Sequence, residues 1–253
     1  MDNSQTMDDF AIGSGFSFTG ATIDELGATE YTLVTIALDE SGSISGYETQ
    51  ISDMLTEAIK ACNKSARSNN LMVRTIRFGS QYRSRNGNGV DELHGFKTLA
   101  EIDLNSYPKL NGGGATPLCD AVYSGVGAMN AYAKSLQDMD FDVNGITFVI
   151  TDGGENASTA SMKMVKDSLT ESIKGEVMES HVSVLIGIDT GYSDDKDNLE
   201  TFQRETGMTQ FIWAGDASKG KLAKLAAFVS QSISSTSVAL GTGGPSQNIL
   251  ATI

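Results

Sequence analysis

Three short runs of apolar, mostly β-branched residues recur along the chain, and segments with helical periodicity separate them. The runs are TLVTIAL at 32–38, ITFVIT at 146–151 and VSVLIGI at 182–188. A strand without polar alternation is typical of a parallel sheet that helices cover on both faces. Because strands and crossover helices alternate, we expect an α/β fold, with a doubly wound, mostly parallel sheet and helices on both faces.

Weaker patterns complete this scheme. The turn sequence NGNG at 86–89 connects an apolar run at 72–78 to a less regular strand near 92–99, which predicts a hairpin. The hairpin would give the sheet one antiparallel edge strand, and a further short strand is expected at 210–213. Apolar residues recur with a helical period in five segments, namely 46–68, a helix starting near Pro117, 158–177, 195–206 and 218–235.

The two ends of the chain differ from its middle. Residues 1–29 are rich in Gly, Ser, Thr and Asp, and residues 237–253 contain no charged side chain. We expect an N-terminal extension at 1–29, one domain at 30–236 and a C-terminal tail at 237–253. The uncharged tail is also suited to lying against the domain or adding to the sheet edge of a partner.

The charge of the chain excludes several classes of partner. The formal net charge of -14 argues against nucleic-acid binding and against adhesion to anionic membranes, since both rest on clustered Lys and Arg. No apolar run approaches the roughly 20 residues that span a bilayer, so we expect no membrane insertion. An acidic chain suits divalent cations, basic partners or simple solubility.

The cysteines and the N-terminus bear on the compartment. Cys62 and Cys119 have neither metal-ligand nor redox-motif spacing, which favours buried free thiols in a reducing compartment. The N-terminal sequence lacks the basic-then-apolar pattern of a signal peptide. These features predict a cytoplasmic location.

Oxygen-bearing side chains follow the expected buried strands or precede a helix. The three stretches are DESGS at 39–43, NGGGAT at 111–116 and DGGE at 152–155. In doubly wound folds, ligands gather beyond the carboxyl ends of the strands, where these stretches would meet. A set of oxygens without His or Cys suits a hard cation such as Mg²⁺, which takes six oxygen ligands.

The combined pattern resembles a von Willebrand factor type A domain. That family carries a metal-ion-dependent adhesion site (MIDAS) with the pattern Asp-x-Ser-x-Ser, then a distant Thr, then a distant Asp. The resemblance covers about residues 30–236 and implies a Rossmann-like fold. All five positions are matched, by Asp39, Ser41, Ser43, Thr116 and Asp152.

The resemblance also implies a function. In the family, the serines and the threonine contact the metal, the aspartates often act through water, and an acidic side chain of a partner fills the remaining position. It therefore implies a non-enzymatic, metal-dependent protein-binding module for adhesion or complex assembly. The metal would be Mg²⁺, with Mn²⁺ or Ca²⁺ as alternatives. Glu40 and Glu155 would add negative charge near the ion.

Structural roles are the alternative for these residues. Ser41 or Ser43 could cap the helix at 46–68, and Thr116 could cap the helix that starts at Pro117. Asp152 could be a turn residue beside two glycines. The chain would then be an assembly protein whose terminal segments make the contacts. A separate alternative, by analogy to family members that partner with ATPases, is a non-catalytic subunit of an ATP-driven machine.

Other motifs are weaker. Residues 189–200 have the length of a calcium loop, but Asp194 stands where that loop needs glycine, which favours a solvated acidic loop. The chain has no GxxxxGK[ST] loop and no G-x-S-x-G elbow. Its only histidines, His94 and His181, are expected to be structural or surface residues. Metal-assisted hydrolysis would have to use Glu40 or Glu155 as the base.

Overall fold

Strand β3 (Glu30–Asp39) lies in the middle of the sheet and is buried along almost its whole length. The computed structural model describes residues 5–13, 15–174, 177–191, 195–216 and 218–242. The sheet has eight strands in the order β1-β2-β5-β4-β3-β6-β7-β8. The other strands are β1 (Met7–Ile12), β2 (Phe16–Ala21), β4 (Leu71–Phe78), β5 (Val90–Thr98), β6 (Asp142–Thr151), β7 (Ser180–Asp189) and β8 (Gln210–Asp216).

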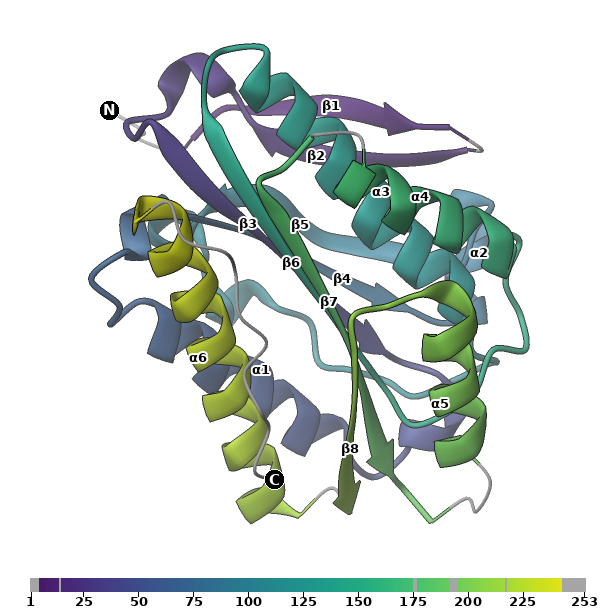
Figure 1. Ribbon diagram of the computed structural model, residues 1–253. Helices are drawn as coiled ribbons and strands as arrows, with labels where there is room; N and C mark the ends of the chain where they lie inside the picture. Colours follow the sequence, from purple (N-terminus) through teal and green to yellow (C-terminus); the bar gives the residue numbers. More distant parts are fainter. Residues whose placement is uncertain (1–4, 14, 175–176, 192–194, 217, 243–253) are drawn as a thin grey trace.

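Helices cover both faces of this sheet (Figure 1). On one face lie α1 (Glu48–Cys62) and α6 (Lys219–Thr242); on the other lie α3 (Leu118–Gln137), α4 (Met162–Lys174) and α5 (Asp195–Thr206). Successive residues of β3 alternate between two separate cores, because side chains of a strand point to opposite faces. Leu33 packs into the core with α3, and Val34 packs into the core with α1 and α6.

The expected fold class is confirmed. Strands β3, β4, β6, β7 and β8 pair in parallel, and β5 runs antiparallel to β4. A four-residue helix, α2 (Arg83–Asn86), lies in the connection between β4 and β5. The antiparallel strand was expected at the edge of the sheet, but β5 is followed by β2 and β1.

Part of the expected N-terminal extension is in fact a hairpin of the sheet. Strands β1 and β2 pair antiparallel, and β2 joins β5 in parallel at Gly20 and Phe96. The side chains of Phe16 and Phe18 are buried. The alternation in FSFTGA places both rings on the face covered by α3, where Phe18 packs near Tyr132.

The last helix is longer than expected and takes in the first residues of the presumed tail. Helix α6 ends at Thr242, and Ser237 accepts a hydrogen bond of 3.0 Å from the Arg67 guanidinium. Residues 243–253 lie outside the described part of the chain. No helix within the described ranges is both long and apolar enough to cross a membrane.

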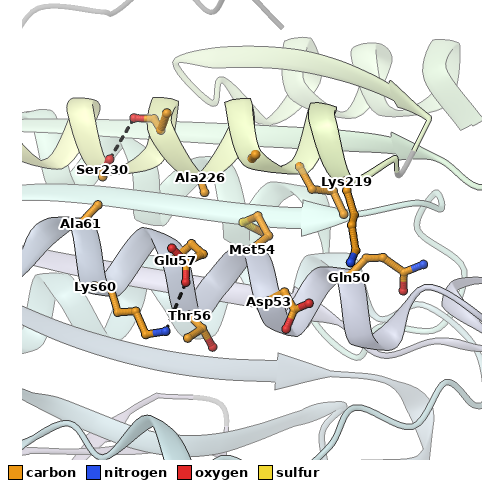
Figure 2. A pocket seen from close by; sticks show the side chains of 13 residues that line it. Gln50, Asp53, Met54, Thr56, Glu57, Lys60, Ala61, Lys219, Ala226 and Ser230 are labelled. Carbon is orange, nitrogen blue, oxygen red and sulfur yellow. Dashed lines mark hydrogen bonds and ion pairs between the residues drawn. The ribbon is translucent and has the colours of Figure 1, made fainter.

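Helices α1 and α6 lie side by side, and a groove of about 690 Å³ runs between them, from Gln50 to Ala61 on α1 and from Lys219 to Ser230 on α6. Figure 2 shows Met54 of α1 and Ala226 of α6 in this groove. Three of the six α6 residues that line it are alanines (Ala223, Ala226 and Ala227), so small side chains face α1 over part of the groove. It lies on the helical layer, whereas the candidate site lies at the carboxyl ends of the strands.

Candidate metal centre

The three predicted loops meet at the carboxyl edge of the sheet. Asp39 is the last residue of β3, and Asp152 directly follows β6, which is the parallel neighbour of β3. Thr116 lies just before α3. Because adjacent parallel strands end at the same edge, the two carboxylates come from residues 113 positions apart in sequence and still lie at one site.

Hydrogen bonds join these side chains into one network. The Ser43 hydroxyl donates to Asp152 Oδ1 at 2.7 Å and lies 3.1 Å from the Ser41 hydroxyl. The Asp39 carboxylate accepts the Ser41 N–H at 2.7 Å through Oδ1. Its other oxygen, Oδ2, accepts the Thr151 hydroxyl. Both serines and both aspartates therefore belong to one connected cluster.

Thr116 faces the same cluster. Its main chain is held in both directions by Asn156, whose Oδ1 accepts the Thr116 N–H at 2.8 Å and whose N–H donates to the Thr116 carbonyl at 3.1 Å. A Cβ atom added at Gly153 would lie 3.4 Å from Thr116 Oγ1 and 3.7 Å from Ser43 Oγ. The two hydroxyls thus line a common space that stays open because residue 153 has no side chain.

The glycine-rich loop is fastened to the first loop by main-chain hydrogen bonds. Gly42 N–H donates to the Gly114 carbonyl and Gly113 N–H donates to the Glu40 carbonyl, both at 3.0 Å. Gly114 has a φ of +73°, and a Cβ there would lie 2.4 Å from Ser80 Oγ. Glycine is required at this position for both conformational and steric reasons.

The capping alternative does not describe these hydroxyls. The N-cap residues are Tyr47 for α1 and Pro117 for α3, and neither end has a side-chain cap within the described residues. At the start of α3, the Glu155 carboxylate instead accepts the Cys119 N–H at 2.6 Å and the Ser158 hydroxyl at 2.6 Å. The side chains of Ser41, Ser43 and Thr116 therefore do not cap these helices and are available to the cluster.

The expectation that Glu40 and Glu155 add charge at an ion is not supported. The buried Glu40 carboxylate accepts the Tyr82 hydroxyl and the Asn111 N–H, and it pairs with Arg77 Nη1 at 3.3 Å. Glu155 is engaged at the start of α3, as described above. Both acidic side chains are committed to other partners, so the aspartates carry the charge of the cluster.

The two aspartates lie in a setting that disfavours negative charge. Burial, and then the nearby charge of Asp152, raises the pKa of Asp39 to about 7, although hydrogen bonds from Thr151 and Ser41 oppose this. Burial likewise raises the pKa of Asp152, against hydrogen bonds from Thr190 and Ser43. No ion pair among the described residues involves either aspartate.

A cation in this space would reverse that penalty, because an opposite charge favours the ionised carboxylates. The available donors are two carboxylates and three hydroxyls, all oxygen, which fits Mg²⁺, Mn²⁺ or Ca²⁺. Within the described ranges, no group of three or more His, Cys, Asp and Glu side chains gathers as a metal site. The cluster differs from such a site because most of its donors are hydroxyls.

Both histidines are buried and structural. His94 contacts the Tyr107 hydroxyl and the Gly95 carbonyl, and His181 lies 3.0 Å from the Thr147 hydroxyl. Burial lowers the pKa of each imidazole to about 4. Each is occupied by these contacts and takes no part in the cluster, so the serines have no imidazole base.

The 189–200 stretch divides between two elements, since Asp189 ends β7 and residues 195–200 begin α5. Residues 192–194, the middle of the expected acidic loop, lie outside the described part of the chain. The calcium loop therefore stays a weak prediction from the sequence.

Three residues in the cluster were not predicted from the sequence. Thr151 donates to Asp39, Thr190 donates to Asp152 Oδ2 at 2.7 Å, and Asn156 holds Thr116. Two of them are threonines at strand ends, so a search for hydroxyls beside the strand-terminal aspartates would have found them. The role of Asn156 depends on contact between two loops and leaves no local signal.

No model of a protein family matches this sequence, and no curated protein matches it. Solved structures match its fold. The pilus adhesin SpaC from Lactobacillus rhamnosus GG superposes with a TM-score of 0.58 at 10% identity, covering 93% of this chain and 33% of that one. Proximal thread matrix protein 1 from the mussel byssus gives 0.53 at 16% identity, covering 79% and 47%.

A von Willebrand factor type A structure from Catenulispora acidiphila gives a TM-score of 0.51 at 14% identity, covering 91% of this chain and 51% of that one. Another structure of the mussel protein carries a MIDAS motif occupied by zinc. This chain spans between a third and about half of the matched chains. The chain has the fold of von Willebrand factor type A domains, as its sequence pattern predicted.

Proposed function

We propose that this chain is a divalent-metal-dependent protein-binding module for adhesion or complex assembly. The observation that supports it is the convergence of Asp39, Ser41, Ser43, Thr116 and Asp152 from three separate loops on one space. A bound Mg²⁺, Mn²⁺ or Ca²⁺ would supply positive charge and a coordination position for an outside oxygen ligand.

The residues divide the work of such a site. The three hydroxyls would contact the ion as neutral ligands, and the aspartates would supply the balancing charge directly or through water. Neutral ligands leave the ion with more of its charge, so it gains more from a carboxylate brought by a partner protein. The engagement of Glu40 and Glu155 with other partners favours this mechanism, because neither competes with that carboxylate.

A binding role is favoured over catalysis. The carboxylates of Glu40 and Glu155, the only bases suggested for metal-assisted hydrolysis, accept hydrogen bonds from the protein itself. Both histidines lie elsewhere in buried contacts. The matched proteins described as a pilus adhesin and a thread matrix protein are of the same binding or structural kind.

Calorimetric titration with Mg²⁺, Mn²⁺ and Ca²⁺ tests the metal. We expect binding by the unchanged chain and its loss in Asp39→Ala and Thr116→Ala, with Thr170→Ala on the exposed side of α4 as the matched control. Equal binding by all variants would overturn the assignment. A captured partner should be released by EDTA and should lose affinity when one of its own acidic side chains is changed to the amide.

Deletion of the terminal segments separates this proposal from an assembly role. If capture of the partner survives removal of residues 243–253 and is still lost with EDTA, the contacts are made at the metal. If capture depends on the deleted segment and is indifferent to EDTA, the chain acts through its terminus, and the cluster only stabilises the loops.

A further inference from the structure

Four asparagines in this chain are followed by glycine, and the fold treats them differently. The pairs begin at Asn86, Asn88, Asn111 and Asn144. In an Asn-Gly pair, the glycine amide nitrogen can approach the preceding side-chain carbonyl carbon, because glycine has no Cβ to obstruct it. Reaction between them requires that the two groups are accessible and are not held in hydrogen bonds.

Two of the pairs are buried and held. Asn144 is 1% exposed within β6, and its Nδ2 donates to the Thr236 carbonyl at 3.2 Å. Asn88 is also buried, and the N–H of the following Gly89 donates to Asp120 Oδ2 at 3.2 Å. Reaction at either pair would require local unfolding of the surrounding structure.

Asn86 is exposed, but both of its reacting groups are occupied. Its side-chain amide donates to the Val90 carbonyl at 2.6 Å, and the N–H of Gly87 donates to the Arg83 carbonyl at 2.9 Å. Because these hydrogen bonds occupy the two reacting groups, both must open before the ring can close. Asn86 is therefore a matched control for an exposed pair whose reacting groups are free.

Asn111 is that exposed pair. It lies in the irregular segment before α3, and among the residues that the structure describes neither its side chain nor the Gly112 N–H has a hydrogen-bond partner. The flanking amides are held, since Asn111 N–H donates to Glu40 Oε1 and Gly113 N–H donates to the Glu40 carbonyl. Hydrogen bonds therefore hold the main chain on both sides of the Asn111–Gly112 peptide bond, whose own N–H is not hydrogen-bonded to any described residue.

We propose that Asn111 is a site of spontaneous deamidation. The Gly112 nitrogen bonds to the Asn111 side-chain carbonyl carbon, and the side-chain carbon–nitrogen bond breaks. Ammonia leaves with the proton from the Gly112 nitrogen, which gives a five-membered imide. Water then adds across the imide and opens it at one of its two carbonyls, giving aspartate or isoaspartate at position 111 without any change in oxidation state.

The product would lie against the candidate metal centre. A Cβ at Gly112 would lie 3.1 Å from the Ser41 carbonyl oxygen and 2.9 Å from Ser45 Oγ, so this loop packs directly on the serine loop. Isoaspartate adds one methylene to the main chain just before that contact. The added length displaces the hydrogen bond of Gly113 to Glu40, and metal affinity falls. This consequence rests on the proposed function, whereas the deamidation does not.

Peptide mass spectrometry of the full chain, incubated in mildly alkaline heavy-oxygen water, follows all four pairs in one sample. We expect incorporation of heavy oxygen at Asn111 about thirtyfold faster than at Asn86, since two hydrogen bonds of about 1 kcal/mol each protect the latter. The buried pairs should remain unchanged over the same period. No label at Asn111, or labelling of Asn86 at an equal or higher rate, would overturn the proposal.

Variants connect the chemistry to the metal. Asn111→Gln lengthens the side chain, so that ring closure is disfavoured, and it should abolish labelling at 111; Asn86→Gln should leave that labelling unchanged. Aged protein should bind Mg²⁺ more weakly than fresh protein, and aged Asn111→Gln should not differ from its fresh sample. If fresh protein binds no metal, the proposed function fails while the labelling result stands. If labelling occurs with unchanged metal affinity, the effect on the metal centre is wrong.

Discussion

Asp39 and Asp152 show that the candidate metal centre has a cost in stability for the metal-free protein. Both carboxylates are buried without a neutralising Lys or Arg among the described residues, and burial raises the pKa of each. A carboxylate with a raised pKa in the folded state destabilises that state at any pH where it is ionised. Such a pair is retained more readily where a cation compensates it than where it only supports the fold.

Replacing Asp39 should therefore change the stability of the protein in opposite directions without and with the metal. In EDTA at mildly alkaline pH, Asp39→Asn should raise the free energy of unfolding by about 1–3 kcal/mol, because the amide removes a buried charge of raised pKa. The same variant should lose any stabilisation by Mg²⁺. Urea denaturation with and without the metal measures both effects.

Asp120→Asn is the matched control. Asp120 is also fully buried, but its carboxylate accepts the N–H groups of Thr159, Ala160 and Gly89. Its replacement should destabilise the protein by about 1–3 kcal/mol, since donors lose their acceptor. If Asp39→Asn destabilises the metal-free protein as strongly as Asp120→Asn does, the Asp39 carboxylate is a structural group.

The buried histidines make stability depend on pH. His181 has a folded-state pKa of about 4, against about 6.5 when exposed in the unfolded chain. Above pH 6.5 both states are neutral at this residue, so it adds no pH dependence. As the pH falls from 6.5 to 4, His181 binds a proton in the unfolded state but not in the folded state. The free energy of unfolding therefore decreases by about 1.4 kcal/mol per pH unit.

Denaturation of the unchanged chain and of His181→Gln across this pH range isolates the contribution. The variant should be less stable at pH 7, since it loses the contact with Thr147, and the difference should shrink as the pH falls toward 4. A difference that stays constant across the range would show that the imidazole is protonated in both states or in neither.

At the scale of elements, the N-terminal hairpin is part of the core. Phe18 is 2% exposed, stacks on Phe10 with ring centroids 4.9 Å apart, and lies near Phe96 and Tyr132. The Arg74 guanidinium lies 5.8 Å from the centre of the same ring. Through Phe18, β2 closes the core under α3 that would otherwise be open beyond β5.

Phe18→Ala should therefore lower the free energy of unfolding by about 3–5 kcal/mol, the usual cost of removing a buried phenylalanine ring. Ser17→Ala is the control, because Ser17 is exposed on the opposite face of the same strand. Chemical denaturation measures both variants. A loss below about 1 kcal/mol for Phe18→Ala would mean that the hairpin is a loosely attached extension, as the sequence alone suggested.

The sequence predicted the central elements well because their signals are local. β3, β6 and β7 contain continuous apolar runs, and each was placed to within a few residues. The hairpin was missed because Phe16 and Phe18 alternate with small and polar residues over a single short strand. Only packing against α3, which lies about a hundred residues away, distinguishes it from a linker.

The residues of the cluster were predictable because their signals are also local. The contacts around the cluster were predicted only in part. Strand-terminal aspartates and the spacing of Ser41 and Ser43 are visible in sequence, and parallel topology brings them to one edge. The orientation of Glu40 toward Arg77, and of Asn156 toward Thr116, depends on contacts between loops. No local pattern encodes those contacts, so the charge at the cluster was overestimated.

At the scale of the whole molecule, the cluster exists only in the folded chain, because its oxygen atoms come from residues 39–43, 116 and 152. A metal that binds there should stabilise the folded state as a whole, by about 2.7 kcal/mol at a hundred times its dissociation constant. The midpoint temperature of thermal unfolding should rise continuously with the Mg²⁺ concentration and should return to its metal-free value when EDTA is added. Asp152→Ala should remove this dependence, and Asp167→Asn on the exposed surface of α4 should retain it. A rise that persists in Asp152→Ala would place the metal elsewhere on this acidic chain, whereas no rise in the unchanged protein would mean that the five converging oxygens support the loops without an ion.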